Sequence, residues 1–85
     1  MISIGQVVYS KKGRDKRKPF IVYRVEGEYV FLIDGSLRKL EKPKKKKIKH
    51  IQITNNIDVG LQVKIINKCY LMDSDIRKAL ESYKL

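Results

Sequence analysis

Residues 20–34 read FIVYRVEGEYVFLID, and this stretch decides the fold class. Residues 20–26 and 29–34 are rich in Val, Ile, Tyr and Phe, the side chains that β-strands favour. Gly27 stands between them, where a hairpin turn needs a residue with a positive φ angle. The stretch therefore predicts two antiparallel strands joined by a tight turn. Both faces of these strands carry apolar side chains, so the pattern alone assigns no inner and outer face.

Three further short segments on either side of this hairpin have strand character. They are residues 6–10 (QVVYS), 37–40 (LRKL) and 48–53 (IKHIQI). Five short strands linked by tight turns in about fifty residues predict a small antiparallel barrel. With 85 residues the chain has room for one domain with a small core. The expected fold is therefore mainly β.

The last part of the chain has helical character. Residues 73–84 (DSDIRKALESYK) can begin with Asp73 or Ser74 as the cap, and three apolar side chains share one face at helical spacing: Ile76, Leu80 and Tyr83. Residues 57–66 fit both an alternating strand and a helix. We favour a helix there, with Thr54 or Asn55 as its cap.

The expected organisation is a barrel over residues 1–54 and a C-terminal helical extension, residues 55–85, packed on or beside it. In the favoured interpretation both helices have a structural role and pack over one end of the barrel. A pair of helices that binds a partner is the alternative.

Positive charge is concentrated in two short segments. The chain has 20 Lys and Arg residues against 9 Asp and Glu, a net charge of +11. Residues 11–18 carry +5 and residues 38–50 carry +7, so everything else nets to −1. Such a surplus indicates a polyanionic partner. In a small barrel the first loop and the connection after the fourth strand can lie at neighbouring rims, and we expect one continuous basic face.

The candidate residues for binding such a polyanion come from these two segments. A solvated loop is the alternative for the lysine run, and base stacking by Tyr9, Tyr23 or Tyr29 is less favoured than packing within the sheet. The candidates are Lys11, Lys12, Gly13, Arg14, Lys16, Arg17, Lys18, Arg38, Lys39, Lys42, Lys44, Lys45, Lys46, Lys47, Lys49 and His50.

Other classes of function have little support. There are no paired carboxylates, no Ser/His/Asp set and no Gly-rich phosphate loop opening a helix, so we expect no enzyme and no small-molecule substrate. One cysteine, Cys69, and one histidine cannot supply a zinc site, and we expect no metal, no cofactor and a packed Cys69. The longest apolar run, residues 29–33, is too short to span a bilayer and the N-terminus does not read as a secretory signal, so we expect a cytoplasmic protein.

The first 54 residues also resemble a known motif. Residues 5–8 (GQVV), 13–16 (GRDK) and 20–22 (FIV) resemble the KOW motif, in which a strand, a basic loop entered through a glycine and a second strand follow one another. With residues 34–35 (DG) and 37–50 (LRKLEKPKKKKIKH), the chain is similar to bacterial KOW-domain RNA-binding proteins related to the archaeal and eukaryotic large-subunit ribosomal protein numbered fourteen.

This resemblance implies an SH3-like barrel whose first loop and basic rim contact RNA, with ribosomal RNA of the large subunit, and also ribosomal proteins, as expected partners. It makes Gly13 the motif glycine and places Arg14, Lys16 and Lys18 in the RNA-facing loop. Many relatives are expected to have a second glycine where this chain has Arg17. A transcription or translation factor module that docks on a protein is the alternative function, and a polybasic membrane-surface protein is the least favoured one.

Overall fold

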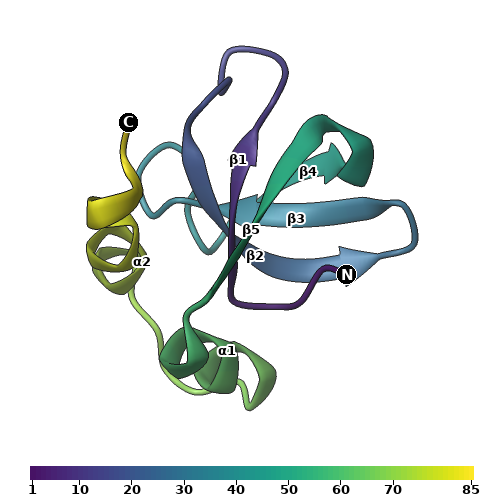
Figure 1. The fold of residues 1–85 in the computed structure, drawn as a ribbon. Helices are drawn as coiled ribbons and strands as arrows, with labels where there is room; N and C mark the ends of the chain where they lie inside the picture. Colours follow the sequence, from purple (N-terminus) through teal and green to yellow (C-terminus); the bar gives the residue numbers. More distant parts are fainter.

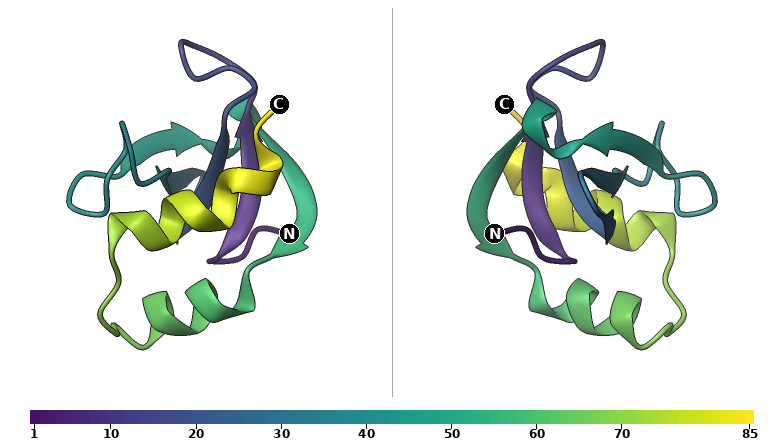
Figure 2. Two further views of the ribbon diagram at one scale, coloured as in Figure 1. Left: turned by 90° about the vertical axis from the view of Figure 1, so that its left-hand side faces the viewer. Right: turned by 90° about the vertical axis from the view of Figure 1, so that its right-hand side faces the viewer.

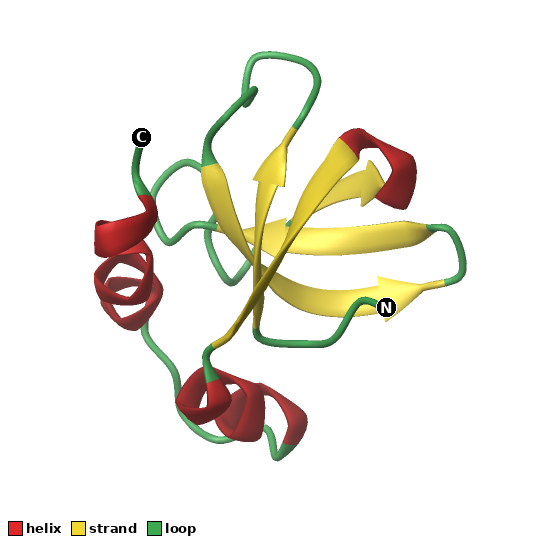
Figure 3. Cartoon of the chain, in the orientation of Figure 1, coloured by secondary structure: helices red, strands yellow, loops and turns green.

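In the computed structural model, which describes residues 1–85, five antiparallel strands form one strongly curled sheet (Figure 1). The order across the sheet is β4-β3-β2-β1-β5, and a short 3-10 turn, η1 (Ile48–His50), joins the two edge strands (Figure 3). The prediction of a mainly β, small barrel-like fold is confirmed. The strands are β1 (Gln6–Ser10), β2 (Pro19–Glu26), β3 (Tyr29–Ile33), β4 (Lys44–Lys47) and β5 (Ile51–Ile57).

The sheet buries both of its faces, which explains the two-sided apolar pattern of the central hairpin. Inside the curl lie Val8, Phe20, Val22, Val30, Leu32 and Ile51. On the outer face, the β-strand residues Val7, Ile21 and Ile33 pack against the helix residues Leu61, Ile76 and Leu80. The chain therefore has two apolar clusters, separated by the sheet itself.

Two helices cover part of the outer face. Helix α1 (Val59–Ile66) follows β5 directly, and α2 (Asp73–Leu80) lies across β1 and β2 before a last 3-10 turn, η2 (Glu81–Tyr83) (Figure 2). Gly35 lies so close beneath α2 that a Cβ atom there would collide with the Asp73 carbonyl oxygen. No helix in the structure is long and apolar enough to cross a bilayer.

The expected helices are present, but their predicted caps were wrong. Asp58, not Thr54 or Asn55, caps α1 by accepting the N–H of Leu61 at 3.0 Å. Helix α2 begins after Met72, whose N–H donates to Asp75 at 2.9 Å. The Asp73 carboxylate instead accepts the Leu40 N–H at 2.8 Å and so holds the preceding loop against the helix.

The prediction of a strand at residues 37–40 was also wrong. Those residues lie in a loop whose first turn is closed by Asp34, which accepts the N–H groups of Ser36 and Arg38 at 2.9 and 2.8 Å. The fourth strand is the lysine run itself, Lys44–Lys47, paired with β3 from Leu32↔Lys44 to Tyr29↔Lys47. The fifth strand begins at Ile51 rather than residue 48, because η1 occupies the corner.

Several features place the helices within the fold rather than beside it. The boundary expected after residue 54 falls inside β5, which continues to Ile57. Leu61, Ile76 and Leu80 make up half of the outer cluster. Cys69, which we expected to be packed, is exposed in the connection between the helices.

Candidate nucleic-acid interface

The β1–β2 loop, residues 11–18, projects from one end of the barrel (Figures 1 and 2). Its shape depends on two residues with positive φ, Gly13 at 81° and Arg17 at 70°. Two backbone hydrogen bonds close the loop. The Arg17 N–H donates to the Ser10 carbonyl oxygen at 2.8 Å, and the Lys18 N–H donates to the Asp15 carbonyl oxygen at 2.9 Å. A glycine would adopt the Arg17 conformation freely, whereas an L-residue adopts it under strain. The turn that the resemblance associates with a second glycine is thus formed here by an arginine.

The two basic segments lie together, as predicted. The Lys46 ammonium group of β4 donates to the carbonyl oxygen of Lys12 at 2.8 Å. The Lys11 N–H donates to the carbonyl oxygen of His50 in η1, also at 2.8 Å. These contacts join the β1–β2 loop to the β4–η1 corner. We call the resulting surface the basic face, and define it by the exposed cations of residues 11–18 together with Lys45, Lys47 and Lys49.

One acidic residue organises this surface, and the sequence analysis did not single it out. Asp15 is only 7% exposed although its loop is otherwise basic. Its carboxylate lies 3.6 Å from the Arg38 guanidinium. Burial lowers the pKa of Lys46, and the charge of Asp15 offsets part of that decrease. A partly buried carboxylate between cations stabilises their close approach. Asp15 therefore links the first loop, the loop after β3 and the lysine strand.

Apart from Gly13, the predicted binding residues divide into exposed and half-buried side chains. The exposed ones are Lys11, Lys12, Arg14, Lys16, Arg17, Lys18, Lys39, Lys42, Lys45, Lys47 and Lys49. The half-buried ones are Arg38, Lys44, Lys46 and His50. In β4 the lysines alternate, because Lys44 and Lys46 share the face of the buried Leu32 and Val30 whereas Lys45 and Lys47 point outward. Lysine stems can cover apolar surface in this way, and charged side chains also protect an edge strand from further pairing.

Two of the half-buried cations are engaged by other groups of the protein. Arg38 pairs with Asp15, and its Nε atom is buried without a hydrogen-bond partner. Lys46 is held by the Lys12 carbonyl. These side chains shape the surface, and the exposed neighbours are better placed to meet an anion.

Lys39 lies away from the basic face. It lines a cleft with Leu40, Tyr70 and Arg77 at the junction with α2. Lys42 closes a turn by donating its N–H to the Lys39 carbonyl at 2.9 Å. The structure therefore does not bring Lys39 together with the first loop.

The density of positive charge affects the titration of two groups. Partial burial is the main cause that lowers the pKa of Lys46, and the charges of Lys44 and Arg38 lower it further. The pKa of His50 is lowered below the ordinary 6.5. Desolvation is the largest cause, and the positive charges of four lysines add to it: Lys12, Lys49, Lys47 and Lys46. Each shift favours the uncharged form, as expected beside crowded cations.

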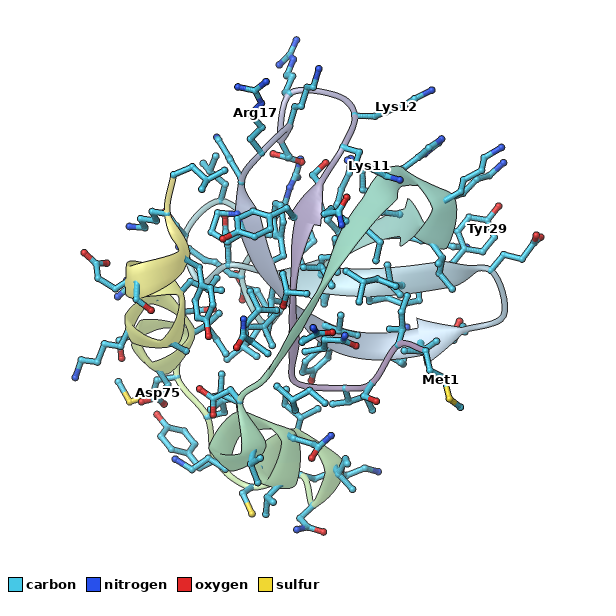
Figure 4. All side chains as sticks on the ribbon, viewed as in Figure 1. Met1, Lys11, Lys12, Arg17, Tyr29 and Asp75 are labelled. Carbon is cyan, nitrogen blue, oxygen red and sulfur yellow. The ribbon has the colours of Figure 1, made fainter.

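Three tyrosines were considered for stacking on bases. Tyr23 packs against the outer apolar cluster, and the Tyr9 hydroxyl donates to the Tyr83 carbonyl at 2.7 Å. Lys45 Nζ lies 4.4 Å from the centre of the Tyr29 ring (Figure 4 shows Tyr29 beside the β2–β3 turn). A cation over the ring is a favourable contact in itself. Base stacking by these residues stays a prediction.

Arg17 stands apart from the cations nearest to β4. Figure 4 shows Arg17 and Lys12 on opposite flanks of the β1–β2 loop. Arg17 borders two neighbouring clefts, one shared with Lys11 and Lys16 and one shared with Arg77 and Lys84. The sequence analysis missed Arg77 and Lys84, since nothing in their helical and C-terminal positions indicates that they approach the first loop.

No protein-family model matches the chain, and no curated protein was found that is similar to it.

Proposed function

We propose that this chain is an RNA-binding module of the KOW type, without catalytic activity, which holds folded RNA through its phosphates. The observation that carries the proposal is the pair of contacts from Lys46 to Lys12 and from Lys11 to His50. They gather two segments, far apart in the sequence, into one surface that holds much of the positive surplus of a +11 chain. The resemblance to KOW-domain proteins supports the same function.

The physical reason is electrostatic. Cations held this close repel one another in the free protein, and a polyanion relieves that repulsion. A nucleic-acid backbone also releases condensed counterions when lysines and arginines replace them. Contacts of this kind position the protein on RNA and respond to the shape of its backbone rather than to its sequence. The expected partner is ribosomal RNA of the large subunit, and the expected compartment is the cytoplasm.

A salt titration of RNA binding tests this function. Replacing the exposed Lys11, Lys12, Lys47 and Lys49 with Gln should lower the slope of log K against log salt by about 0.7–0.9 for each phosphate that the variant no longer neutralises. Replacing Lys64 and Lys78 with Gln, two lysines exposed on α1 and α2 away from the basic face, is the control and should leave the slope unchanged. Equal slopes for the two variants would contradict the proposed interface. Sedimentation with the large ribosomal subunit, before and after a salt wash, tests the expected partner.

Docking on a protein is the second candidate, and one observation favours it. Helix α1 leaves Val59 and Ile66 exposed at 63% and 56%, with Val63 between them on the outward side. Exposed apolar side chains that gather on one helix are typical of protein contacts. A Val59→Ser, Val63→Ser variant separates the two functions, because it should lose a protein partner and retain RNA binding.

A further inference from the structure

A cleft of about 370 Å³ opens on the flank of the β1–β2 loop opposite the lysine strand. Its walls come from the base of this loop, from the turn after β3 and from α2 with the residues that follow it. This volume is at the lower end of the range for small-molecule pockets, about 300–1,000 Å³. The cleft therefore has room for a group of nucleotide size.

Four cations line this cleft from separate parts of the chain. Arg17 and Lys18 belong to the β1–β2 loop, Arg77 to α2 and Lys84 to the C-terminal segment. Asp34 is the one acidic side chain in the lining, and it already accepts the N–H groups of Ser36 and Arg38. The ion pair between Lys84 and Glu81, at 3.4 Å, is exposed and hence weak. The Arg77 guanidinium already donates to the Gly35 carbonyl oxygen, so Arg17, Lys18 and Lys84 are the cations best placed to meet a phosphate.

The cleft also has an apolar lining that a phosphate alone does not require. Leu37 is 71% exposed and lines it together with Pro19 and Leu80. Leaving a leucine in water costs free energy that a flat ring packed upon it would recover. A nucleotide carries both complementary parts, a phosphate for the cations and a base for the apolar wall.

The backbone conformation of Arg17 is a further observation that points to a ligand site in this cleft. This residue holds a φ of 70° at the edge of the cleft, where glycine would be unstrained. Strained backbone persists where the surrounding structure maintains it, and such positions gather at ligand sites. An arginine here places a guanidinium group between this cleft and its neighbour.

We infer that this cleft binds one unpaired nucleotide of the RNA, with its phosphate at Arg17, Lys18 and Lys84 and its base against Leu37. The inference rests on the proposed function and specifies the RNA further, as one that has an unpaired nucleotide beside a paired segment. The basic face would hold the paired backbone, and the cleft would accept a nucleotide that projects from a bulge or a loop. Single-stranded bulges and loops are the parts of RNA whose bases proteins can reach.

The first test compares a hairpin RNA that has one bulged nucleotide with the same hairpin fully paired, by fluorescence anisotropy. The wild type should bind the bulged RNA about fivefold more tightly or better, as a single accommodated base contributes at least that much. Leu37→Ser and Lys84→Gln should each reduce this preference. The controls are Ile66→Ser, an exposed apolar position on α1, and Lys78→Gln, an exposed lysine of α2 that does not line the cleft. Equal affinity of the wild type for both RNAs overturns the inference and leaves the proposed function standing.

The second test needs no RNA. Adenosine 5′-monophosphate, titrated into the labelled protein, should shift the backbone amide NMR signals of Ser36 and Leu37 as well as that of Arg17. Inorganic phosphate at equal concentration should shift Arg17 and leave Leu37 unaffected. Identical shifts with both would show a simple anion site and overturn the inference. If adenosine 5′-monophosphate gave these specific shifts but the protein bound neither hairpin, the cleft would still be a nucleotide site and the proposed RNA-binding function would be contradicted.

Discussion

The ammonium group of Lys46 donates a hydrogen bond to the carbonyl oxygen of Lys12, and the two residues are 34 positions apart in the sequence. This contact gives the lysine run two different roles. Lys46 is half-buried and anchors the first loop, whereas its neighbour Lys45 is exposed and lies over Tyr29. Four identical residues in a row are therefore not equivalent.

That difference can be measured by comparing Lys46→Gln with Lys45→Gln. We expect Lys46→Gln to lower the free energy of unfolding by about 1 kcal/mol, because it removes one hydrogen bond and the anchoring of the loop. It should also increase hydrogen exchange in residues 11–18. Lys45→Gln should leave stability and exchange almost unchanged and should reduce the salt dependence of RNA binding. Equal effects of both changes on the loop would mean that Lys46 does not anchor it.

Arg17 allows strain and binding to be separated. Its φ of 70° costs about 1–2 kcal/mol relative to an ordinary conformation, and a glycine removes this cost but adds freedom to the unfolded chain. Arg17→Gly should therefore leave stability unchanged or raise it by up to about 1 kcal/mol, while RNA binding weakens. Arg17→Ala should weaken binding equally without any gain in stability.

Lys68 is the matched control for this experiment. It has a φ of 55° in the turn that ends α1, where the Cys69 N–H donates to the Lys64 carbonyl at 2.9 Å. Lys68→Gly relieves the same kind of strain at the end of α1, outside the basic face. The stability of the Lys68→Gly variant should be unchanged or slightly raised, as for Arg17→Gly, and its RNA affinity should equal that of the wild type. A stabilised Arg17→Gly protein with full affinity would show that the guanidinium group has no part in binding.

His50 reports on the charge of the basic face, and it is the one histidine of the chain. Desolvation and the nearby lysines hold its pKa below 6.5, so the unfolded chain takes up this proton more readily than the folded one. Its contribution to stability should therefore fall as the pH decreases below about 6.5, before the carboxylates titrate. Bound phosphates offset the lysine charges and should raise the pKa of His50. RNA affinity should then increase as the pH falls from about 7 to 5, and His50→Gln should remove that part of the dependence. An NMR titration of the imidazole with and without RNA measures the pKa directly, and a pKa that falls on binding would contradict the model.

The sequence predicted the elements whose signal is local. The central hairpin, β1 and both helices follow from β-branched composition, a turn glycine and helical spacing. The strand at Lys44–Lys47 was missed because four identical side chains hide the alternation between the inward and outward faces. It forms because β3 offers an unpaired edge, a property of the sheet and not of the lysines.

The predicted site divides in the same way. Placing the two basic segments together required only barrel topology and charge. The roles of Asp15, Arg77 and Lys84 depend on contacts between distant segments, since an acid within a basic loop and two cations near α2 have no signal in a single sequence. The exposure of Cys69 and the distance of Lys39 from the first loop were not predicted for the same reason, because the path of each connection decides them.

The last prediction concerns the dependence of the barrel on its helices. Ending the chain after Ile57 would keep all five strands and remove Leu61, Ile76 and Leu80 from the outer cluster. Val7, Ile21 and Ile33 would then face water, and each large apolar side chain that loses its burial costs about 1.5–3 kcal/mol. Since a domain of this size is stable by only about 5–15 kcal/mol, we expect residues 1–57 not to fold cooperatively.

A point substitution tests the same dependence with the full chain. Ile76→Ala should lower the free energy of unfolding by about 2–5 kcal/mol, because it opens a cavity between α2 and the sheet. Ile66→Ala, at a position of α1 that is 56% exposed, is the matched control and should change stability by about 0.5 kcal/mol or less. Chemical denaturation followed by circular dichroism compares the wild type, the two variants and residues 1–57. A cooperative, β-rich transition in residues 1–57, together with a small effect of Ile76→Ala, would show that the strands are stable without α2, and the basic face would then be a property of the barrel alone.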